Sequence, residues 1–415
     1  MLTTLDRTMI VSDPAADWAA SGAVALTGRP DGPPLVPPGR AATRARELSA
    51  RLAAQTGGSV AVDGAALLAE RAAFTGAARR GTVSAGGACR LLPTADGWAA
   101  VSCARPDDPS LLGALVGAEL PEDVWPPVEA WLRAHTGDEL AERAGLLGLA
   151  AGPVAPASPI APEVVPPPRP VAGLLVVDFS ALWAGPLCAH LLGLAGARVV
   201  KVETPSRPDG ARRGDPGFYR LLHAGHRSVV LDPGEPSGRR ALRALVERAD
   251  IVVEASRPRA LARFGLDAHA AVAAGTTWIS ITAAGRESDR VGFGDDVAAG
   301  AGLVAREPGG VPLFAGDAIA DPLTGLTAAA RALTAPAGDG GALHDVSMTD
   351  VVAATLDPGA EPSARARRVD GGWVVDTCGG PVPVAPPRHR APAGRASRSG
   401  EDTAEVLREL RIPAP

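Results

Sequence analysis

The strongest constraint in this 415-residue sequence is the alternation of short β-branched runs with helical stretches after residue 170. Strand candidates lie at residues 174–177, 198–202, 228–231, 251–253 and 278–281, and helical stretches lie between them at residues 187–194, 238–248 and 259–274. Such alternation is typical of a mainly parallel sheet covered by helices on both faces. We therefore expect an α/β fold in which residues 171–355 form a Rossmann-like parallel-sheet domain.

A proline-rich stretch at residues 153–170 (PVAPASPIAPEVVPPPRP) precedes this pattern. Proline lacks the amide donor and fixes its own φ angle, so the stretch predicts a linker between two modules. Residues 1–152 form the first module, which we expect to be a small α+β lid-like domain. Residues 356–415 form a tail that we expect to pack on the main domain.

Local patterns in these outer regions are weaker. In the first module, helices are expected at residues 40–54 and 121–148, and two short strands within residues 86–104. Trp125 and Trp131 are the expected core anchors of this module. The tail predicts a hairpin in VDGGWVVDTCGGPVPV and a short helix at residues 401–410.

Composition excludes several classes of partner. The formal net charge is -5 and the basic residues are scattered among acids, which argues against nucleic-acid binding. The four cysteines lie far apart without CxxC spacing, which predicts reduced thiols and no bound metal. No run approaches the ~18 apolar residues of a membrane span, and the N-terminus lacks a signal-peptide pattern. We therefore expect a cytoplasmic protein without a membrane partner.

Seven blocks after the linker resemble the class III CoA-transferase superfamily, and they occur in the family's order. The blocks are VDFSALWAGP at 177–186, LLGLAGARVVKVETP at 191–205, HAGHRSVVLD at 223–232, ADIVVEASRPRALARFGL at 249–266, WISITAAG at 278–285, ADPLTGL at 320–326 and HDVSMTD at 344–350. The resemblance implies transfer of coenzyme A from an acyl-CoA to a carboxylic acid, with no permanently bound cofactor, by a homodimer of interlocked chains. Formyl-CoA transferase, carnitine CoA-transferases and α-methylacyl-CoA racemase share the fold, so the fold alone does not determine the reaction.

The remaining segments depart from the family's order. Residues 17–39 resemble the family's segment just before the catalytic carboxylate, and residues 95–154 resemble its lid domain, yet both precede the main domain here. The motif PDGPPL at residues 30–35 recurs as PGGVPL at residues 308–313. The chain therefore resembles a truncated first copy carrying the lid-like module, fused to a second copy.

Asp321 is the candidate nucleophile, because it matches the family's catalytic aspartate in ADPLTGL. In the first copy, the matching position falls near Thr43 or Arg44, and neither is a carboxylate. A carboxylate can attack a thioester to form a mixed anhydride, which the released thiolate reopens as an enzyme–CoA thioester. Pro322 at the first helical position would make Asp321 an N-cap, and a simple capping role is the structural alternative. Asp317 is a competing carboxylate.

Coenzyme A contacts are also implied by the resemblance. Leu231 and Arg263 match family positions that contact the coenzyme, and the turn containing Ala181, Trp183 and Ala184 matches the loop along the pantetheine arm. Arg263 can equally be a solvated helix residue, and so can the nearby Arg257 and Arg259. His223 and His226 lie in a loop before a strand, where a surface role and a role in coenzyme binding both stay open.

Two other functions remain as alternatives. A racemase uses a His/Asp pair, but Phe293 occupies the position of the histidine and cannot exchange a proton. A non-catalytic CoA-binding protein is compatible with the degenerate first copy. Asp295 and Asp296 lack further ligands for a metal, so we interpret them as helix-capping residues.

Overall fold

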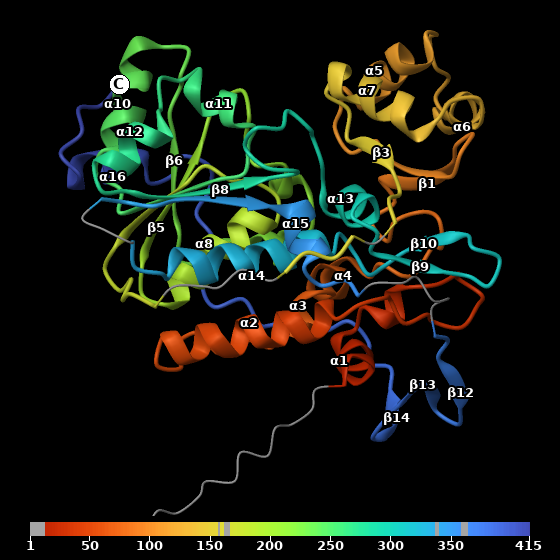
Figure 1. Ribbon diagram of the computed structural model, residues 1–415. Helices are drawn as coiled ribbons and strands as arrows, with labels where there is room; N and C mark the ends of the chain where they lie inside the picture. Colours follow the sequence, from red (N-terminus) through yellow and green to blue (C-terminus); the bar gives the residue numbers. More distant parts are fainter. Residues whose placement is uncertain (1–12, 157, 162–166, 337–339, 358–363) are drawn as a thin grey trace, which may run out of the picture.

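The computed structural model describes residues 13–156, 158–161, 167–336, 340–357 and 364–415. Its centre is a six-stranded sheet in the order β11-β8-β7-β4-β5-β6, in which every neighbouring pair is parallel (Figure 1). The strands are β4 (Leu175–Asp178), β5 (Arg198–Glu203), β6 (Arg227–Val230), β7 (Ile251–Glu254), β8 (Thr277–Thr282) and β11 (Leu343–Ser347). The chain winds outward from β4 and then returns to β7 on the other side. This is the doubly wound Rossmann order, so the α/β prediction is confirmed.

Helices cover both faces of the sheet. From β4 onward the helices are α8 (Ala184–Leu194), α9 (Pro216–His223), α10 (Pro236–Val246), α11 (Pro258–Ala262), α12 (Ala268–Ala273), α13 (Gly294–Gly300), α14 (Ala320–Ala332), α15 (Met348–Ala353), α16 (Thr403–Glu409) and the 3-10 helix η2 (Gly210–Arg213). Val176 faces the core built with α8 and α14, whereas its neighbour Val177 faces the core built with α10 and α16. Burial on both faces explains the continuous apolar runs seen in the sequence.

Two details of this half differ from the sequence prediction. The helix expected at residues 259–274 is split into α11 and α12, because Gly265 adopts a φ of +79° that ends the first helix. The sixth strand, β11, was not expected as a strand, since only Leu343 and Val346 of its five residues are apolar and the strand lies at the edge of the sheet.

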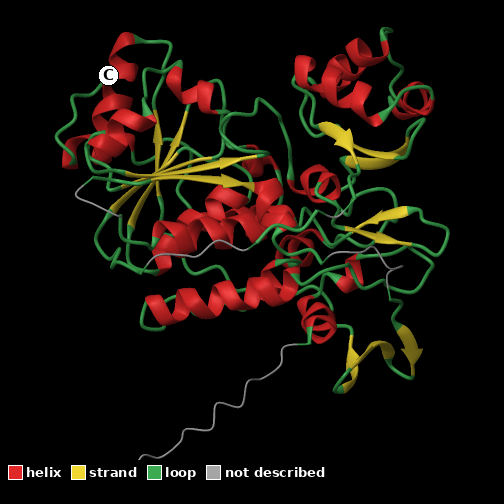
Figure 2. Ribbon diagram, viewed as in Figure 1, coloured by secondary structure: helices red, strands yellow, loops and turns green. Residues whose placement is uncertain are grey.

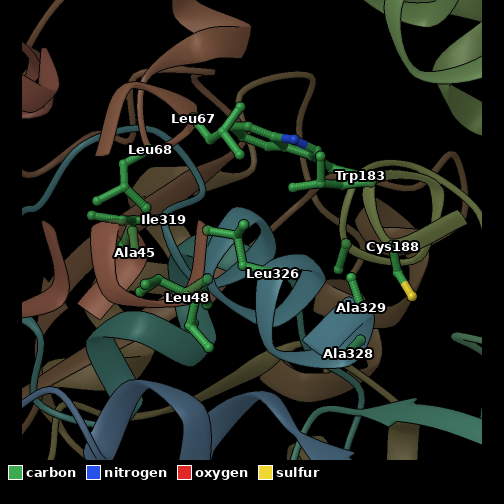
Figure 3. Packing of buried hydrophobic residues seen from close by; sticks show 14 of the residues in the cluster. Ala45, Leu48, Leu67, Leu68, Trp183, Cys188, Ile319, Leu326, Ala328 and Ala329 are labelled. Carbon is green, nitrogen blue, oxygen red and sulfur yellow. The ribbon is translucent and has the colours of Figure 1, made fainter. Parts of the chain in front are cut away.

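The N-terminal part contributes two separate elements. Helices α1 (Pro14–Ser21), α2 (Ala41–Gln55), α3 (Gly64–Leu67) and α4 (Glu70–Thr75) and the 3-10 helix η1 (Val24–Leu26) join the core of the main domain. Helix α2, expected at residues 40–54, packs directly on α14. Figure 3 shows Leu48 of α2 and Leu326 of α14 in this core. This part of the N-terminal module is therefore continuous with the Rossmann core.

The second element is the lid-like unit. It comprises β1 (Cys89–Pro93), β2 (Trp98–Ser102), β3 (Ala151–Pro153), α5 (Asp108–Val116), α6 (Trp125–Arg133) and α7 (Gly137–Leu147). Figure 2 shows its small antiparallel sheet and helices set apart from the large sheet. Trp125 and Trp131 only partly enter its core, and arginine guanidinium groups lie over their rings instead. Both rings nevertheless pack against the core of this unit, as expected of anchors, and both residues stay half-buried.

The C-terminal tail packs in two places. Strands β12 (Arg367–Val369), β13 (Gly372–Thr377) and β14 (Gly380–Pro383) form a sheet against α1 (Figure 1). A separate short hairpin, β9 (Val304–Arg306) with β10 (Pro312–Phe314), contacts β1 of the lid-like unit. Helix α16 covers the edge strand β6, where Thr403 Oγ1 accepts a hydrogen bond from Val230 N at 3.0 Å. In the described residues, no helix is long and apolar enough to cross a membrane.

Candidate active site

Asp321 is the second residue of α14, and Ile319 takes the N-cap position. The expected N-cap role of Asp321 was therefore wrong, because the helix begins at Ala320, two residues earlier than Pro322 alone would indicate. The backbone amide of Asp321 donates to Ala318 O at 2.9 Å, and Ala318 itself has a φ of +45°. The residue remains partly exposed at the positive end of a 13-residue helix.

Two further acids of α13 lie close to Asp321. Burial, together with the negative charges of Asp295 and Asp317, raises the pKa of Asp321 to about 7, while Arg71 opposes the shift. Burial and Asp317 likewise raise the pKa of Asp295 to about 7. Asp296 accepts hydrogen bonds from Phe293 N at 2.8 Å and from Ser102 Oγ at 3.0 Å, so it caps α13 as expected. Neighbouring acids with raised pKa values titrate as a group near neutral pH.

Gly294 is required by this arrangement. A Cβ atom at this position would lie 2.2 Å from Asp321 Oδ2 and 2.4 Å from Ala318 O. Any side chain at residue 294 would therefore displace the carboxylate of Asp321. The close approach of α13 to the start of α14 depends on this glycine.

Asp317, the competing carboxylate, is held by Arg71. The guanidinium forms a two-pronged ion pair with Asp317, with Arg71 Nε 2.9 Å from Oδ2. Asp317 is buried, with 1% of its side chain exposed. Sequence reasoning missed Arg71, which belongs to α4 and lies 246 positions from Asp317. No local pattern around an isolated arginine in a short helix could have indicated this contact.

Arg71 also links the acids to the turn after β4. Its guanidinium lies 5.3 Å from the centre of the Trp183 ring, and Phe218 packs edge-on against the same ring at 5.3 Å. Trp183 is almost fully buried, and its Nε1 has no hydrogen-bond partner among the described residues. The acids, Arg71 and the Trp183 turn therefore form one continuous site at the carboxyl end of the sheet, where doubly wound folds bind ligands.

The turn that contains Trp183 is held in place by hydrogen bonds and an ion pair with buried residues. Leu182 has a left-handed φ of +70°, and its amide donates to Asp209 Oδ1 at 3.0 Å. The buried Lys201 of β5 lies 2.9 Å from Asp209 Oδ2 and donates to the Ser180 carbonyl. These contacts hold a backbone conformation that a leucine rarely adopts.

Comparison with known proteins identifies the fold segment that carries this site. Residues 171–372 match the sequence profile described as CoA-transferase family III. This part of the chain belongs to CoA-transferase family III. The match begins just before β4 and includes Asp295, Asp317 and Asp321, but it excludes Arg71.

Several named proteins are similar to part of this chain. A succinate–glutarate CoA-transferase of Agrobacterium fabrum is 32% identical, over 45% of this chain and 53% of its own length. A succinyl-CoA–D-citramalate CoA-transferase of Chloroflexus aurantiacus is 32% identical, over 41% of this chain and 46% of its own. A crystal structure of a CAIB/BAIF family protein from Brucella suis has a TM-score of 0.45 and 27% identity, covering 51% of this chain and 66% of that one. The chain thus spans about half the length of the curated relatives it matches.

The family positions expected to contact coenzyme A lie at the same edge of the sheet. Ala181 is exposed in the turn, and Ala184 begins α8. Arg263 is exposed just after α11. Leu231 is buried in the core beside α10, and its backbone N donates to Glu203 O at 3.1 Å. These assignments stay predictions.

The two histidines of the family block at residues 223–232 are not surface residues. His223 ends α9 with 2% exposure, and His226 has 5% exposure. Burial lowers the pKa of His226 to about 3 and that of His223 well below its usual value. The surface role left open for them is therefore wrong, because the tail covers the loop: Ser397 Oγ donates to His226 O at 3.2 Å.

Proposed function

We propose that the chain transfers coenzyme A from an acyl-CoA thioester to a carboxylic acid, with Asp321 as the nucleophile. The observation that carries this proposal is a partly exposed carboxylate in the family III segment, with a pKa of about 7, at the start of a helix. Asp317 is a weaker candidate, since it is buried in an ion pair with Arg71. Perturbed acids at the ligand-binding edge of a sheet favour a functional role.

The proposed reaction uses one carboxylate twice. Ionised Asp321 attacks the thioester carbonyl, and the C–S bond breaks. The CoA thiolate departs, and Asp321 and the acyl group are joined as an aspartyl–acyl anhydride. The thiolate then attacks the aspartyl carbonyl, which releases the donor acid and leaves an aspartyl–CoA thioester. The acceptor carboxylate attacks this thioester, and the freed thiolate attacks the acceptor carbonyl of the new anhydride. The products are a new acyl-CoA and free Asp321.

Arg71 supplies the positive charge of the proposed site. Its charge interacts with both Asp321 and Asp295 as well as with its partner Asp317. An arginine beside the nucleophile would stabilise the oxyanion that forms when the thioester carbonyl is attacked. The same charge favours the approach of an acceptor carboxylate to a site that otherwise contains acids.

Short dicarboxylic acids are the proposed acceptors. The relatives are named for succinate, glutarate and citramalate, each a small acid with two carboxylates. We propose succinyl-CoA as the donor to test first and glutarate as the acceptor. A monocarboxylic acid of the same chain length is the matched control for the second carboxylate.

Intact-protein mass spectrometry tests the proposal. The chain is incubated with succinyl-CoA or glutaryl-CoA and then treated with hydroxylamine, which converts an activated aspartyl group into a hydroxamate. We expect the hydroxamate to map to Asp321, to be absent from Asp321→Asn and to persist in Asp317→Asn. Coenzyme A binding without any adduct would instead support the non-catalytic alternative. Exchange of solvent deuterium into the acyl α-carbon without an acceptor acid would support the racemase. That result would contradict the expectation from Phe293, which stands before α13 where a racemase has its histidine.

A further inference from the structure

The short sequence repeat belongs to a longer structural repeat. Leu35 N donates to Thr27 O at 3.1 Å, and the equivalent residues Leu313 and Ala305 pair in the β9–β10 hairpin. In the turn, Gly32 N donates to Arg29 O at 3.2 Å, just as Gly310 N donates to Glu307 O at 2.8 Å. The equivalent positions are 278 residues apart, the separation of Arg29 from Glu307. Residues 17–54 and 295–332 therefore form two copies of one unit, here called the N-terminal unit and the catalytic unit.

The two units contact each other through equivalent residues. Arg29 pairs with its own equivalent Glu307, with Arg29 Nη2 2.6 Å from Glu307 Oε2. Leu35 and its equivalent Leu313 share one buried cluster. Leu48 and Leu326, also equivalent, lie in the core where α2 packs on α14 (Figure 3). Contacts between like positions are the mark of an isologous interface, in which a surface meets a second copy of itself.

We infer that the N-terminal unit takes the place of a partner subunit: it packs on the face of the catalytic unit that a second copy of that unit would otherwise cover. One chain then builds the complete site, and no homodimer through this face is needed. The apolar centre of this face is buried, since Leu313 and Leu326 have no exposed surface. Docking of the N-terminal unit also brings the following helix α4, and with it Arg71, to Asp317. The expected homodimer is therefore unnecessary for assembly of this site.

Cysteine cross-linking tests this inference without any assay of activity. Arg29 and Glu307 have 50% and 26% of their side chains exposed, so replacing both with cysteine leaves the core intact. The background variant is Cys378→Ser, which removes the one fully exposed native thiol. The double variant is treated with a short bismaleimide and measured by intact mass spectrometry under denaturing conditions, with the two single variants as controls.

We expect the cross-linked product of the double variant to keep the mass of one chain, about 41.9 kDa. A product with the mass of two chains, absent from the single variants, would show that the units meet in trans and would overturn the inference. Absence of any cross-link would also overturn it, because the two positions would then not be neighbours.

A second test rests on the proposed function and asks where Arg71 acts. Arg71→Ala and Asp321→Ala chains are co-expressed and assayed for CoA transfer. If each site lies within one chain, the mixture stays as inactive as its parts. If the N-terminal unit came from a partner, random pairing would restore roughly a quarter of wild-type activity. A wild-type chain without activity would refute the proposed function but leave the cross-linking result standing.

Discussion

The N-terminal unit and the catalytic unit have similar backbone structure, but their equivalent polar residues have opposite environments. In the N-terminal unit, Thr43 Oγ1 donates to Asp17 Oδ2 at 2.6 Å, and Arg46 pairs with the other oxygen of Asp17. The equivalent residues of the catalytic unit are Asp321 and Asp295, two acids whose pKa values burial raises to about 7. The hydrogen-bonded pair of Thr43 and Asp17 stabilises the fold, whereas the pair of Asp321 and Asp295 is destabilising when both acids are ionised, because their charges repel. Such unfavourable arrangements mark functional sites, because only function retains them.

Asp321→Thr would make the catalytic unit resemble the N-terminal unit and should have the largest effect. We expect CoA transfer to fall at least about 10³-fold, since a hydroxyl without a base cannot replace a carboxylate nucleophile. The steady-state rate with succinyl-CoA and glutarate measures the loss. Thr43→Ser, the conservative change at the equivalent position, is the control and should leave the rate unchanged.

The pH profile of the wild type sharpens the same comparison. Only the ionised carboxylate is nucleophilic, and the pKa of Asp321 is raised to about 7. The rate should therefore rise with pH through about pH 7 and level off above it. A rate already constant at pH 5 would contradict Asp321 as the group that must be ionised.

Replacing Arg71 of the site should cost more stability than replacing Arg46 of the N-terminal unit, and this is the next largest expected effect. Arg71→Met leaves the buried Asp317 unpaired and should lower the free energy of unfolding by about 3 kcal/mol. Arg46→Met removes an arginine with 60% of its side chain exposed and should cost less than about 1 kcal/mol. Urea unfolding at pH 8 measures both. Equal losses would show that Arg71 has no special structural role.

The sequence predicted the parts of this molecule that depend on local pattern. Alternating apolar runs indicated five of the strands of the parallel sheet, and the block ADPLTGL indicated Asp321. Arg71 was missed because its contact with Asp317 depends on how two distant segments dock. The choice between Thr43 and Arg44 was open in the sequence, and the common separation of 278 positions now favours Thr43. The burial of His223 likewise depends on the tail, which no local pattern around the histidine reveals.

Thr43→Asp should make the N-terminal unit resemble the catalytic unit, because it places a second acid beside Asp17. Thr43 and Asp17 are both buried, so the new carboxylate would be withdrawn from water and would lie beside the carboxylate of Asp17. Its folded pKa should exceed its unfolded value, so the penalty is absent in acid and grows as pH rises between the two values. We expect a loss of about 2 kcal/mol in the free energy of unfolding at pH 8 and a smaller loss at pH 5. Thr43→Val, which adds no charge, should show no such pH dependence.

The contact between Arg29 and Glu307 should have the smallest effect, although it joins the two units. Both side chains are partly exposed, and solvent screens such pairs. Arg29→Glu and Glu307→Arg should each lower the free energy of unfolding by less than about 1 kcal/mol, and the charge-swapped double variant should recover most of the loss. A coupling well above that size in a double-mutant cycle would mean that the ion pair, rather than the leucines beneath it, holds the units together. Leu35 and Leu313 are the better candidates for that role, because both are buried in one shared apolar cluster, and burial of apolar surface is the larger stabilising effect.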